Sequence, residues 1–264
     1  IPLGIEIVDG NSVDQGVRFD DVNTDGLIDI LVSKSGNAKK VYINNGTGWT
    51  NETGNWSIPI NFIGSSSEGL GVELADVNSD GKVDIIRSQE PNIKEVWLNN
   101  GSGWINASND WHIPDFFVTS DNNDTGLRIL DINGDSLPDL VKGGVPGNAW
   151  FNNGSGWTGH SEYSPNLEFV DNSGNRPDLG VRFIELNGDG LVDMAQNFLS
   201  NVSVINQTCV DQGNSTEQCV IGQNITFATN SKLNNGSGWV SAPGWLVPEK
   251  FVDGLKQRRR KGGI

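Results

Sequence analysis

The sequence predicts an all-β protein built from repeated four-stranded units. A nine-residue acidic motif occurs four times, and its first residues lie 55, 55 and 54 positions apart. Short stretches that alternate apolar and polar residues flank the motifs, and no stretch is rich in the helix formers Ala, Leu, Glu and Lys. Four short strands repeated at about 55 residues are typical of a propeller blade, so we expect a β-propeller.

Each unit is expected to contain its strands in the same order. In the second unit they are Ile58–Ile63, Leu70–Leu74, Val83–Ile86 and Glu95–Leu98, followed by the turn Asn99–Trp104. The turn reads Asn-Asn-Gly-Ser/Thr-Gly-Trp in all four units, and its Asn-Gly pair is a strong hairpin signal. The matching stretches elsewhere are 16–19, 28–32 and 41–43 in the first unit, 126–129, 140–141 and 150–151 in the third, and 180–183 and 192–194 in the fourth.

The repeats divide the chain into successive blades. We expect blades at about 1–55, 56–110, 111–164 and 165–244, the start of a fifth at 245–254, and a basic tail at 255–264. Residues 1–10 and 245–254 both match the opening of a unit, and the chain begins with Ile1 rather than Met. We therefore expect a mature or excised fragment whose array continues in a longer chain or in a neighbouring subunit.

The repeated motif predicts up to four calcium loops. Oxygen-bearing side chains stand at positions 1, 3, 5 and 9, position 7 would offer its backbone carbonyl, and Gly26, Gly81 and Gly190 would allow a positive-φ turn. Asp, Asn and Gly also dominate turns that bind no metal, but four copies that all keep the final Asp favour the metal reading. The predicted Ca²⁺ ligands are Asp21, Asn23, Asp25, Leu27 and Asp29; Asp76, Asn78, Asp80, Lys82 and Asp84; Asp131, Asn133, Asp135, Leu137 and Asp139; and Glu185, Asn187, Asp189, Leu191 and Asp193.

Composition excludes several function classes. The formal net charge is −15, yet 12 of the 33 acidic residues lie in the four motifs, and the strong acidity speaks against nucleic acid as a partner. No run of 18 apolar residues exists, so we expect no membrane insertion. His112 and His160 are the only histidines, and neither stands in a motif with a Ser or Cys nucleophile. We therefore expect no catalysis.

Two further sets of residues point to an extracellular setting. Cys209 and Cys219, the only cysteines, lie in a Gln/Asn/Ser/Thr-rich insertion of roughly 28 residues in the fourth unit; a local disulfide is favoured over two free thiols. Twelve Asn-x-Ser/Thr sequons occur, of which four coincide with the Asn-Gly turns. The other eight are predicted glycosylation sites in a glycosylating host: Asn51, Asn55, Asn106, Asn123, Asn201, Asn206, Asn214 and Asn224.

The tryptophan that ends each turn allows two interpretations. Trp49, Trp104, Trp157 and Trp239 stand at the same point of every unit. They would serve either as platforms on which sugars stack or as packing anchors between blades, and the packing role is favoured.

The pattern Gly-Val-Arg-Phe-x-Asp-Val-Asn-x-Asp-Gly-Leu-x-Asp-Ile resembles the FG-GAP/VCBS repeat family, which includes the integrin alpha-chain propeller and microbial surface proteins. The resemblance covers residues 1 to about 250. It implies a propeller, usually of seven blades, with Ca²⁺ held between the second and third strands of a blade, and no catalysis. Ser136 in place of the loop glycine and Glu185 in place of the first Asp depart from the pattern, so these two sites are expected to be weaker or altered.

The resulting expectation is an extracellular or cell-surface, calcium-stabilised propeller with a structural, adhesive or assembly role, including filament formation. Its expected partners are further repeats of the same or a neighbouring chain, surface proteins or glycans. The alternative is a lectin-like propeller that binds carbohydrate through Trp and Asp residues at the blade edges.

Overall fold

The computed structural model describes residues 2, 4–172, 177–211 and 217–244, without the side chains of 197–211 and 217–230. The predicted start of a fifth unit at 245–254 and the basic tail lie outside this part. The chain forms two compact units, residues 1–168 and 169–264. None of the described helical residues forms a segment long and apolar enough to cross a membrane.

Four antiparallel sheets of four strands each confirm the all-β fold class and its blade-like construction. Neighbouring strands in the sequence are neighbours in each sheet, and one sheet lies within each of the four predicted repeat ranges. The first sheet contains β1 (Val17–Asp20), β2 (Asp29–Val32), β3 (Lys40–Asn44) and β4 (Trp49–Asn51); the second contains β5 (Val72–Ala75), β6 (Asp84–Gln89), β7 (Ile93–Asn99) and β8 (Trp104–Asn106); the third contains β9 (Leu127–Leu130), β10 (Asp139–Lys142), β11 (Asn148–Asn152) and β12 (Trp157–Gly159); and the fourth contains β13 (Val181–Ile184), β14 (Asp193–Asp211), β15 (Glu217–Asn234) and β16 (Trp239–Ser241). A 3₁₀ turn, η1 (Ser161–Tyr163), follows β12.

The predicted order of strands within a unit was wrong by one element. Ile58–Ile63 is a connection between sheets, and the fourth strand of each blade begins at the Trp that follows the Asn-Gly turn. The alternation of Ile58, Ile60 and Phe62 arises because these side chains are buried between two blades, not because they pair within one sheet. The acidic loop consequently joins the first and second strands of a blade, instead of the second and third as the resemblance implied.

The connection also bonds to the blade that precedes it. The N–H of Phe62 donates to the carbonyl of Ser33, and the hydroxyl of Ser33 donates to the carbonyl of Ile60 at 2.8 Å. The same backbone bond recurs one repeat later between Phe117 and Ser88. These two connections thus fasten one blade to the next by backbone hydrogen bonds.

Two hydrophobic cores fill the spaces between successive blades of residues 1–168. In the first core, Val22, Leu31 and Val41 of the first blade meet Val83 and Ile85 of the second. The second core repeats this arrangement one unit later, and both draw apolar side chains from the connecting segment. Because an isolated blade cannot bury both faces, stacking is what completes each core.

The turn tryptophans pack between blades, which confirms the favoured interpretation for two of them. Trp104 packs against the first core, where its ring meets Trp56 edge-to-face at 5.4 Å between centroids. Trp157 meets Trp111 in the same way at 5.3 Å in the second core. Both indole N–H groups donate to backbone carbonyls, so these rings are anchored and partly buried.

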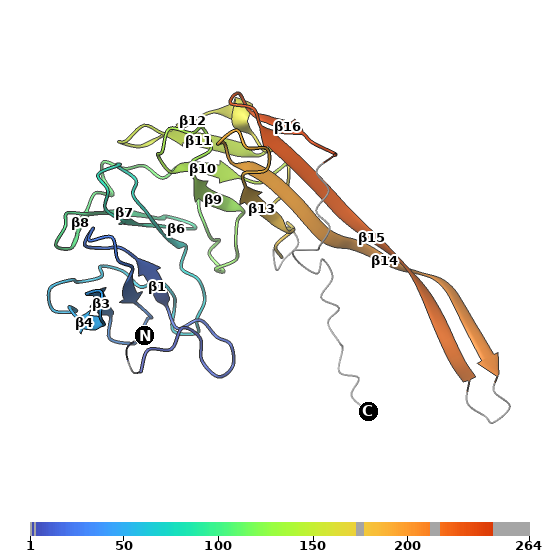
Figure 1. Ribbon diagram of the computed structural model, residues 1–264, viewed down its shortest axis with the longest axis horizontal. Helices are drawn as coiled ribbons and strands as arrows, with labels where there is room; N and C mark the ends of the chain where they lie inside the picture. Colours follow the sequence, from blue (N-terminus) through green and yellow to red (C-terminus); the bar gives the residue numbers. More distant parts are fainter. Residues whose placement is uncertain (1, 3, 173–176, 212–216, 245–264) are drawn as a thin grey trace. The chain divides into compact units, whose positions relative to one another are not determined.

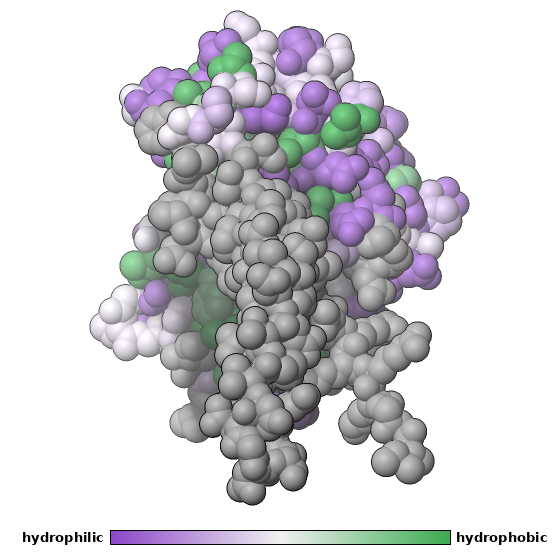
Figure 2. Space-filling view, turned by 90° about the vertical axis from the view of Figure 1, so that its right-hand side faces the viewer, coloured by the Kyte–Doolittle hydropathy of each residue, from purple (hydrophilic) through white to green (hydrophobic). Residues whose placement is uncertain are grey.

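The first blade keeps one apolar face in contact with solvent. Phe19 is 42% exposed and Ile28 is 50% exposed, whereas Val83, which occupies the position of Ile28 in the second blade, is 6% exposed. Ile7 is 43% exposed, but its counterpart Phe62 is 1% exposed. On the face seen in Figure 2, the described residues are mostly hydrophilic or intermediate, and the hydrophobic ones lie in separate patches.

The insertion in the fourth unit is a hairpin, not a further sheet. β14 and β15 continue past the blade as one antiparallel ribbon from the Met194–Lys232 pair to the Asp211–Glu217 pair (Figure 1). Its backbone register places Cys209 directly opposite Cys219. The predicted disulfide itself lies outside the described side chains, but the register is compatible with it.

Candidate metal-binding loops

The four acidic loops share one backbone conformation with two left-handed residues. Position 6 has a φ of +84° at Gly26, +83° at Gly81 and +84° at Gly190, as predicted, and +71° at Ser136. Position 4 is left-handed as well, although Thr24 and Ser79 carry side chains there. Ser136 therefore preserves the turn in place of glycine, at a cost of about 1 kcal/mol for an L-residue in this region.

Backbone N–H groups turn the polar side chains of the first loop inward. The two carboxylate oxygens of Asp21 accept the N–H groups of Asp25 and Gly26 at 3.2 and 2.7 Å. The Asn23 side-chain oxygen accepts the N–H of Asp25, and Oδ1 of Asp25 accepts the N–H of Leu27 at 2.9 Å. Each oxygen keeps a second lone pair, so these contacts orient potential ligands without exhausting them.

The other loops repeat these contacts with small departures. In the second loop, Asp76 and Asp80 accept the equivalent N–H groups, and Lys82 forms an ion pair with Asp80 at 3.3 Å. In the third, Asp131 accepts the N–H groups of Gly134 and Ser136 at 2.7 and 2.8 Å. In the fourth, the longer Glu185 side chain turns one oxygen to the N–H groups of Asn187 and Gly188. The fourth loop thus has a different first position, as expected from its Glu.

The final Asp of the motif has a role that the sequence did not indicate. Asp29, Asp84, Asp139 and Asp193 are completely buried. In the second loop, one oxygen of Asp84 accepts the N–H of Val77 at 3.0 Å, and the other accepts the N–H of Asn99 at 2.7 Å. All four loops contain the same pair of contacts. This carboxylate therefore ties its loop to the third strand of its own blade.

Burial dominates the electrostatics of these carboxylates. Desolvation raises the pKa of Asp84 to about 7 and the pKa of Asp139 to about 6, against the opposing effect of their two backbone hydrogen bonds. The pKa of Asp29 is also raised, first by burial and then by the nearby charges of Asp25 and Asp21. A buried carboxyl group beside two further acidic residues would gain from a bound cation.

The first Asn of the turn extends this network into the preceding blade. The side-chain amide of Asn99 donates to the carbonyl of Val22 at 2.9 Å, and that of Asn152 donates to the carbonyl of Val77 at 2.8 Å. Because Val22 and Val77 also donate their N–H groups to Asp29 and Asp84, the final Asp residues of neighbouring blades are linked through the backbone of one Val and one turn Asn. We call this Asp–Asn–carbonyl contact the interblade clasp.

The predicted ligands are thus brought together loop by loop, but not as closed cages. Among the described residues, no group of three or more His, Cys, Asp or Glu side chains is arranged to hold a metal ion. Positions 1, 3 and 5 line the turn, while the carboxylate at position 9 lies deeper, bonded to its two N–H donors. The donor set contains only oxygen, which suits a hard cation such as Ca²⁺.

Three of the eight predicted glycosylation sites are exposed: Asn51, Asn55 and Asn106. Asn123 is half-buried. Asn201, Asn206, Asn214 and Asn224 lie outside the described side chains. The exposed sites are in or next to the last strand of a blade, where a glycan would meet solvent.

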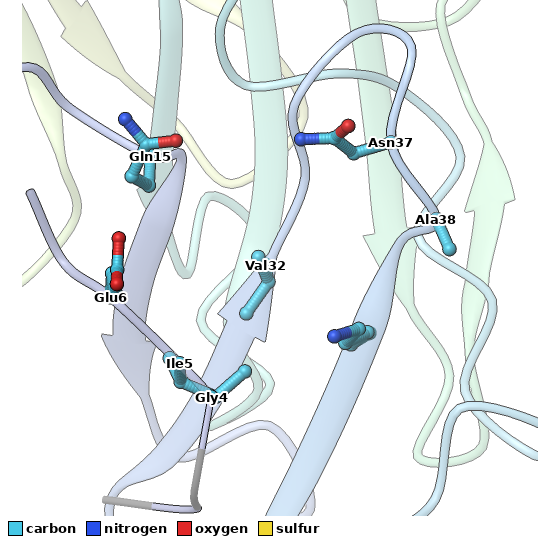
Figure 3. Close-up of a pocket in the computed structure, with 8 residues that line it drawn as sticks. Gly4, Ile5, Glu6, Gln15, Val32, Asn37 and Ala38 are labelled. Atoms are coloured by element: carbon cyan, nitrogen blue, oxygen red, sulfur yellow. The ribbon is translucent and has the colours of Figure 1, made fainter. Parts of the chain in front are cut away.

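A pocket of about 350 Å³ lies beside the first blade, away from the acidic loops. Figure 3 shows Glu6 and Gln15 on one side of it and Asn37 and Ala38 on the other, with Val32 between them. Val32 and Lys40, which form its sheet side, are paired in register. Their counterparts in the second blade, Arg87 and Glu95, form an ion pair at 3.5 Å.

Comparison with known proteins supports the repeat assignment. The family model for the FG-GAP-like repeat matches residues 21–87, which include the first two acidic loops. The resemblance seen in the sequence is therefore confirmed for these residues. No curated protein sequence matches the chain significantly.

Two solved structures illustrate the similarities. An Agrocybe aegerita lectin, described as recognising non-reducing terminal N-acetylglucosamine, is 16% identical with a TM-score of 0.49; the match covers 88% of this chain and 66% of the lectin. A chain of the Photorhabdus luminescens Tc holotoxin pore is 14% identical with a TM-score of 0.49, and the match covers 87% of this chain and 9% of the toxin chain.

Proposed function

We propose that this chain is a calcium-stabilised β-propeller module with a structural, adhesive or assembly role at the cell surface or outside the cell, and without catalysis. The observation that carries the proposal is the fourfold repetition of one loop, in which backbone N–H groups hold an all-oxygen donor set around a tight turn. Turn-forming sequences alone do not require a buried third carboxyl group, at position 9, in every copy.

In each loop the calcium ligands would be the side-chain oxygens at positions 1, 3 and 5 and the carbonyl at position 7. Bound Ca²⁺ supplies positive charge and rigid coordination to a loop that otherwise concentrates acidic groups. The buried Asp at position 9 fixes the loop to the sheet, with its remaining lone pairs available to the ion. Position 2 contributes Val22 and Val77 to the interblade cores, so fixing the loop also fixes core residues.

Calcium removal is the direct test. Ca²⁺ at 100 times its dissociation constant would add about 2.7 kcal/mol per site, so strong chelation should lower the melting temperature and Ca²⁺ should restore it. Mg²⁺ at the same concentration is the control, because its smaller, stricter octahedral geometry fits a flexible oxygen loop less well. A melting curve that does not change on chelation would exclude a calcium-stabilised fold.

The exposed face of the first blade supports an assembly role. Phe19, Ile28 and Ile7 are exposed at positions whose counterparts in the next blade pack against or contribute to the interblade core. The proposed partner is a further blade of the same type, since the internal interfaces already show which surface fits this face. Light scattering of the chain in Ca²⁺ should detect self-association, and the paired change Phe19→Ser and Ile28→Ser should reduce it. A strictly monomeric wild-type chain at high concentration would contradict this part of the proposal.

A further inference from the structure

The second residue of the first strand is Arg in three of the blades and Glu in the second blade. Arg18, Arg128 and Arg182 occupy the second residue of β1, β9 and β13, and each forms an ion pair with an Asp four residues earlier, at 3.2, 2.7 and 2.9 Å. In the second blade both members of the pair are replaced: Glu73 stands in place of the Arg and Gly69 in place of the Asp.

The glycine at position 69 is not required by the fold. Gly69 has no left-handed φ, and a Cβ at this position would meet no atom within 4 Å. Gly71, two residues later, has a φ of +66°, and its Cβ would lie 2.3 Å from the carbonyl oxygen of Ser88. Glycine is therefore demanded at 71 but not at 69. Its effect at 69 is to leave space beside Glu73.

That space belongs to a pocket of about 330 Å³ within residues 1–168. Arg18, Glu73 and Arg128 line it, one from each of three successive blades, together with Asp124 and Gly69. Phe62 contributes to its apolar wall, and the guanidinium carbon of Arg18 lies 6.0 Å from the centre of that ring. A pocket of this size, with apolar walls and a few convergent polar groups, has the general character of a small-molecule site.

The polar groups of the pocket retain unused bonding capacity. Within the described residues, Glu73 makes no hydrogen bond or ion pair of its own, so both carboxylate oxygens are available as acceptors. Arg18 uses Nη1 to bond Asp14 and the carbonyl of Val17, which leaves Nη2 as a donor. Arg128 is held bidentately by Asp124 at 2.9 and 2.7 Å. Desolvation raises the pKa of Glu73, whose side chain still reaches solvent, and this shift is opposed by Arg128 and Arg18 and reinforced by Asp124.

The charges of the pocket select the type of ligand. An anion would be repelled by Glu73 and Asp124, and a cation would be repelled by Arg18 and Arg128. A neutral ligand with adjacent hydroxyl groups can bond to both the acidic and the basic side chains, because each hydroxyl donates one hydrogen bond and accepts others. One hydroxyl would donate to Glu73 while accepting from Nη2 of Arg18. The geometry points to a binding site for one neutral saccharide ring in this pocket, held through a pair of adjacent hydroxyl groups.

The test uses the complete chain in Ca²⁺ with the methyl glycosides of glucose, galactose, mannose and N-acetylglucosamine as probes. Binding is measured by saturation-transfer NMR and titration calorimetry at probe concentrations up to about 50 mM, a range suited to weak affinities. At least one probe should bind to the wild-type chain. Binding by none of the four would overturn the inference.

The first test variant gives the second blade the residues that the other three blades have at the same positions. Gly69→Asp with Glu73→Arg gives the second blade the ion pair of the other three, so this variant should fold and lose saccharide binding. Glu73→Gln keeps the shape of the side chain and should weaken binding at least about tenfold, because a charged acceptor is lost. Asp110→Asn, at an exposed position remote from the pocket, is the matched control and should bind as the wild type does. Unchanged binding by the double variant or by Glu73→Gln would place any saccharide elsewhere and refute the proposal. The melting response to Ca²⁺ of the same samples tests the calcium proposal separately.

Discussion

The interblade clasp predicts a large difference between two chemically identical substitutions. Asn44 and Asn99 occupy the same position of the turn, and each side-chain oxygen accepts the N–H of the glycine two residues later. The Asn99 amide donates to the buried carbonyl of Val22 in the preceding blade, whereas the Asn44 amide donates to the exposed carbonyl of Ile28 in its own blade at 3.2 Å. Asn44→Ala is therefore an internal control for Asn99→Ala.

The magnitude follows from the groups left without a partner. Each substitution removes the bond to the glycine, at a cost of about 1 kcal/mol. Asn99→Ala also leaves the Val22 carbonyl unsatisfied in a position with no solvent exposure, which costs about 1–3 kcal/mol more. We therefore expect Asn99→Ala to destabilise the chain by about 2 kcal/mol more than Asn44→Ala. At roughly 2–4 °C per kcal/mol for a protein of this size, the two melting temperatures should differ by about 4–8 °C.

Thermal and urea unfolding, followed by tryptophan fluorescence in saturating Ca²⁺, measure this difference. Asn152→Ala is a second instance, since the amide of Asn152 donates to the carbonyl of Val77, which is also fully buried. The two clasp variants should behave alike, and Asn44→Ala should lose only the stability of the glycine bond, about 1 kcal/mol. Equal losses for Asn44→Ala and Asn99→Ala would show that the interblade bond adds nothing to stability, and the reasoning would fail.

Three further predictions concern the loops and the hairpin. Asp80→Ala should reduce the stabilisation by Ca²⁺ more than Glu185→Ala does, because the fourth loop already departs from the pattern; calorimetric titration with Ca²⁺ would reveal the reverse order if this is wrong. In chelated protein, the raised pKa values of Asp84 and Asp139 mean that the folded state binds protons more readily than the unfolded state, so stability should fall as pH rises from about 4 to about 7; unfolding curves that show rising stability over this window would contradict the assignment. Mass mapping without reduction should find Cys209 linked to Cys219, and two alkylatable thiols would refute the pairing.

The repeated pattern was sufficient to predict the sheets and the turn conformation of the loops. Gly26, Gly81 and Gly190 adopt the positive φ that their position implied, because this requirement is local to the residue. The strand order was predicted less well. The alternation of Ile58, Ile60 and Phe62 shows that one side of this segment is buried. A connection buried between two blades has the same alternating sequence as a strand buried on one face of a sheet, so the pattern cannot distinguish them.

The role of the final Asp could not be read from the motif. Asp84 and its partner Asn99 are 15 residues apart, and Asn99 reaches Val22 across 77 residues. Such pairings depend on how strands and blades stack, which local spacing does not encode. Glu73 and Gly69 stand where the other blades have Arg and Asp, but they were not singled out from the sequence; the structure shows that both line one pocket.

The clasp has a consequence for how such a chain can grow in evolution. The second blade contains both halves of the contact: its Asn99 amide reaches the Val22 carbonyl of the blade before it, and its Val77 carbonyl receives the Asn152 amide of the blade after it. A tandem duplication of one 55-residue unit would therefore create a new interface that is chemically complete, with no compensating mutation elsewhere. Duplication or deletion of whole units can therefore change the number of blades. Substitutions such as Gly69 and Glu73 can then give one blade a function that the other blades lack.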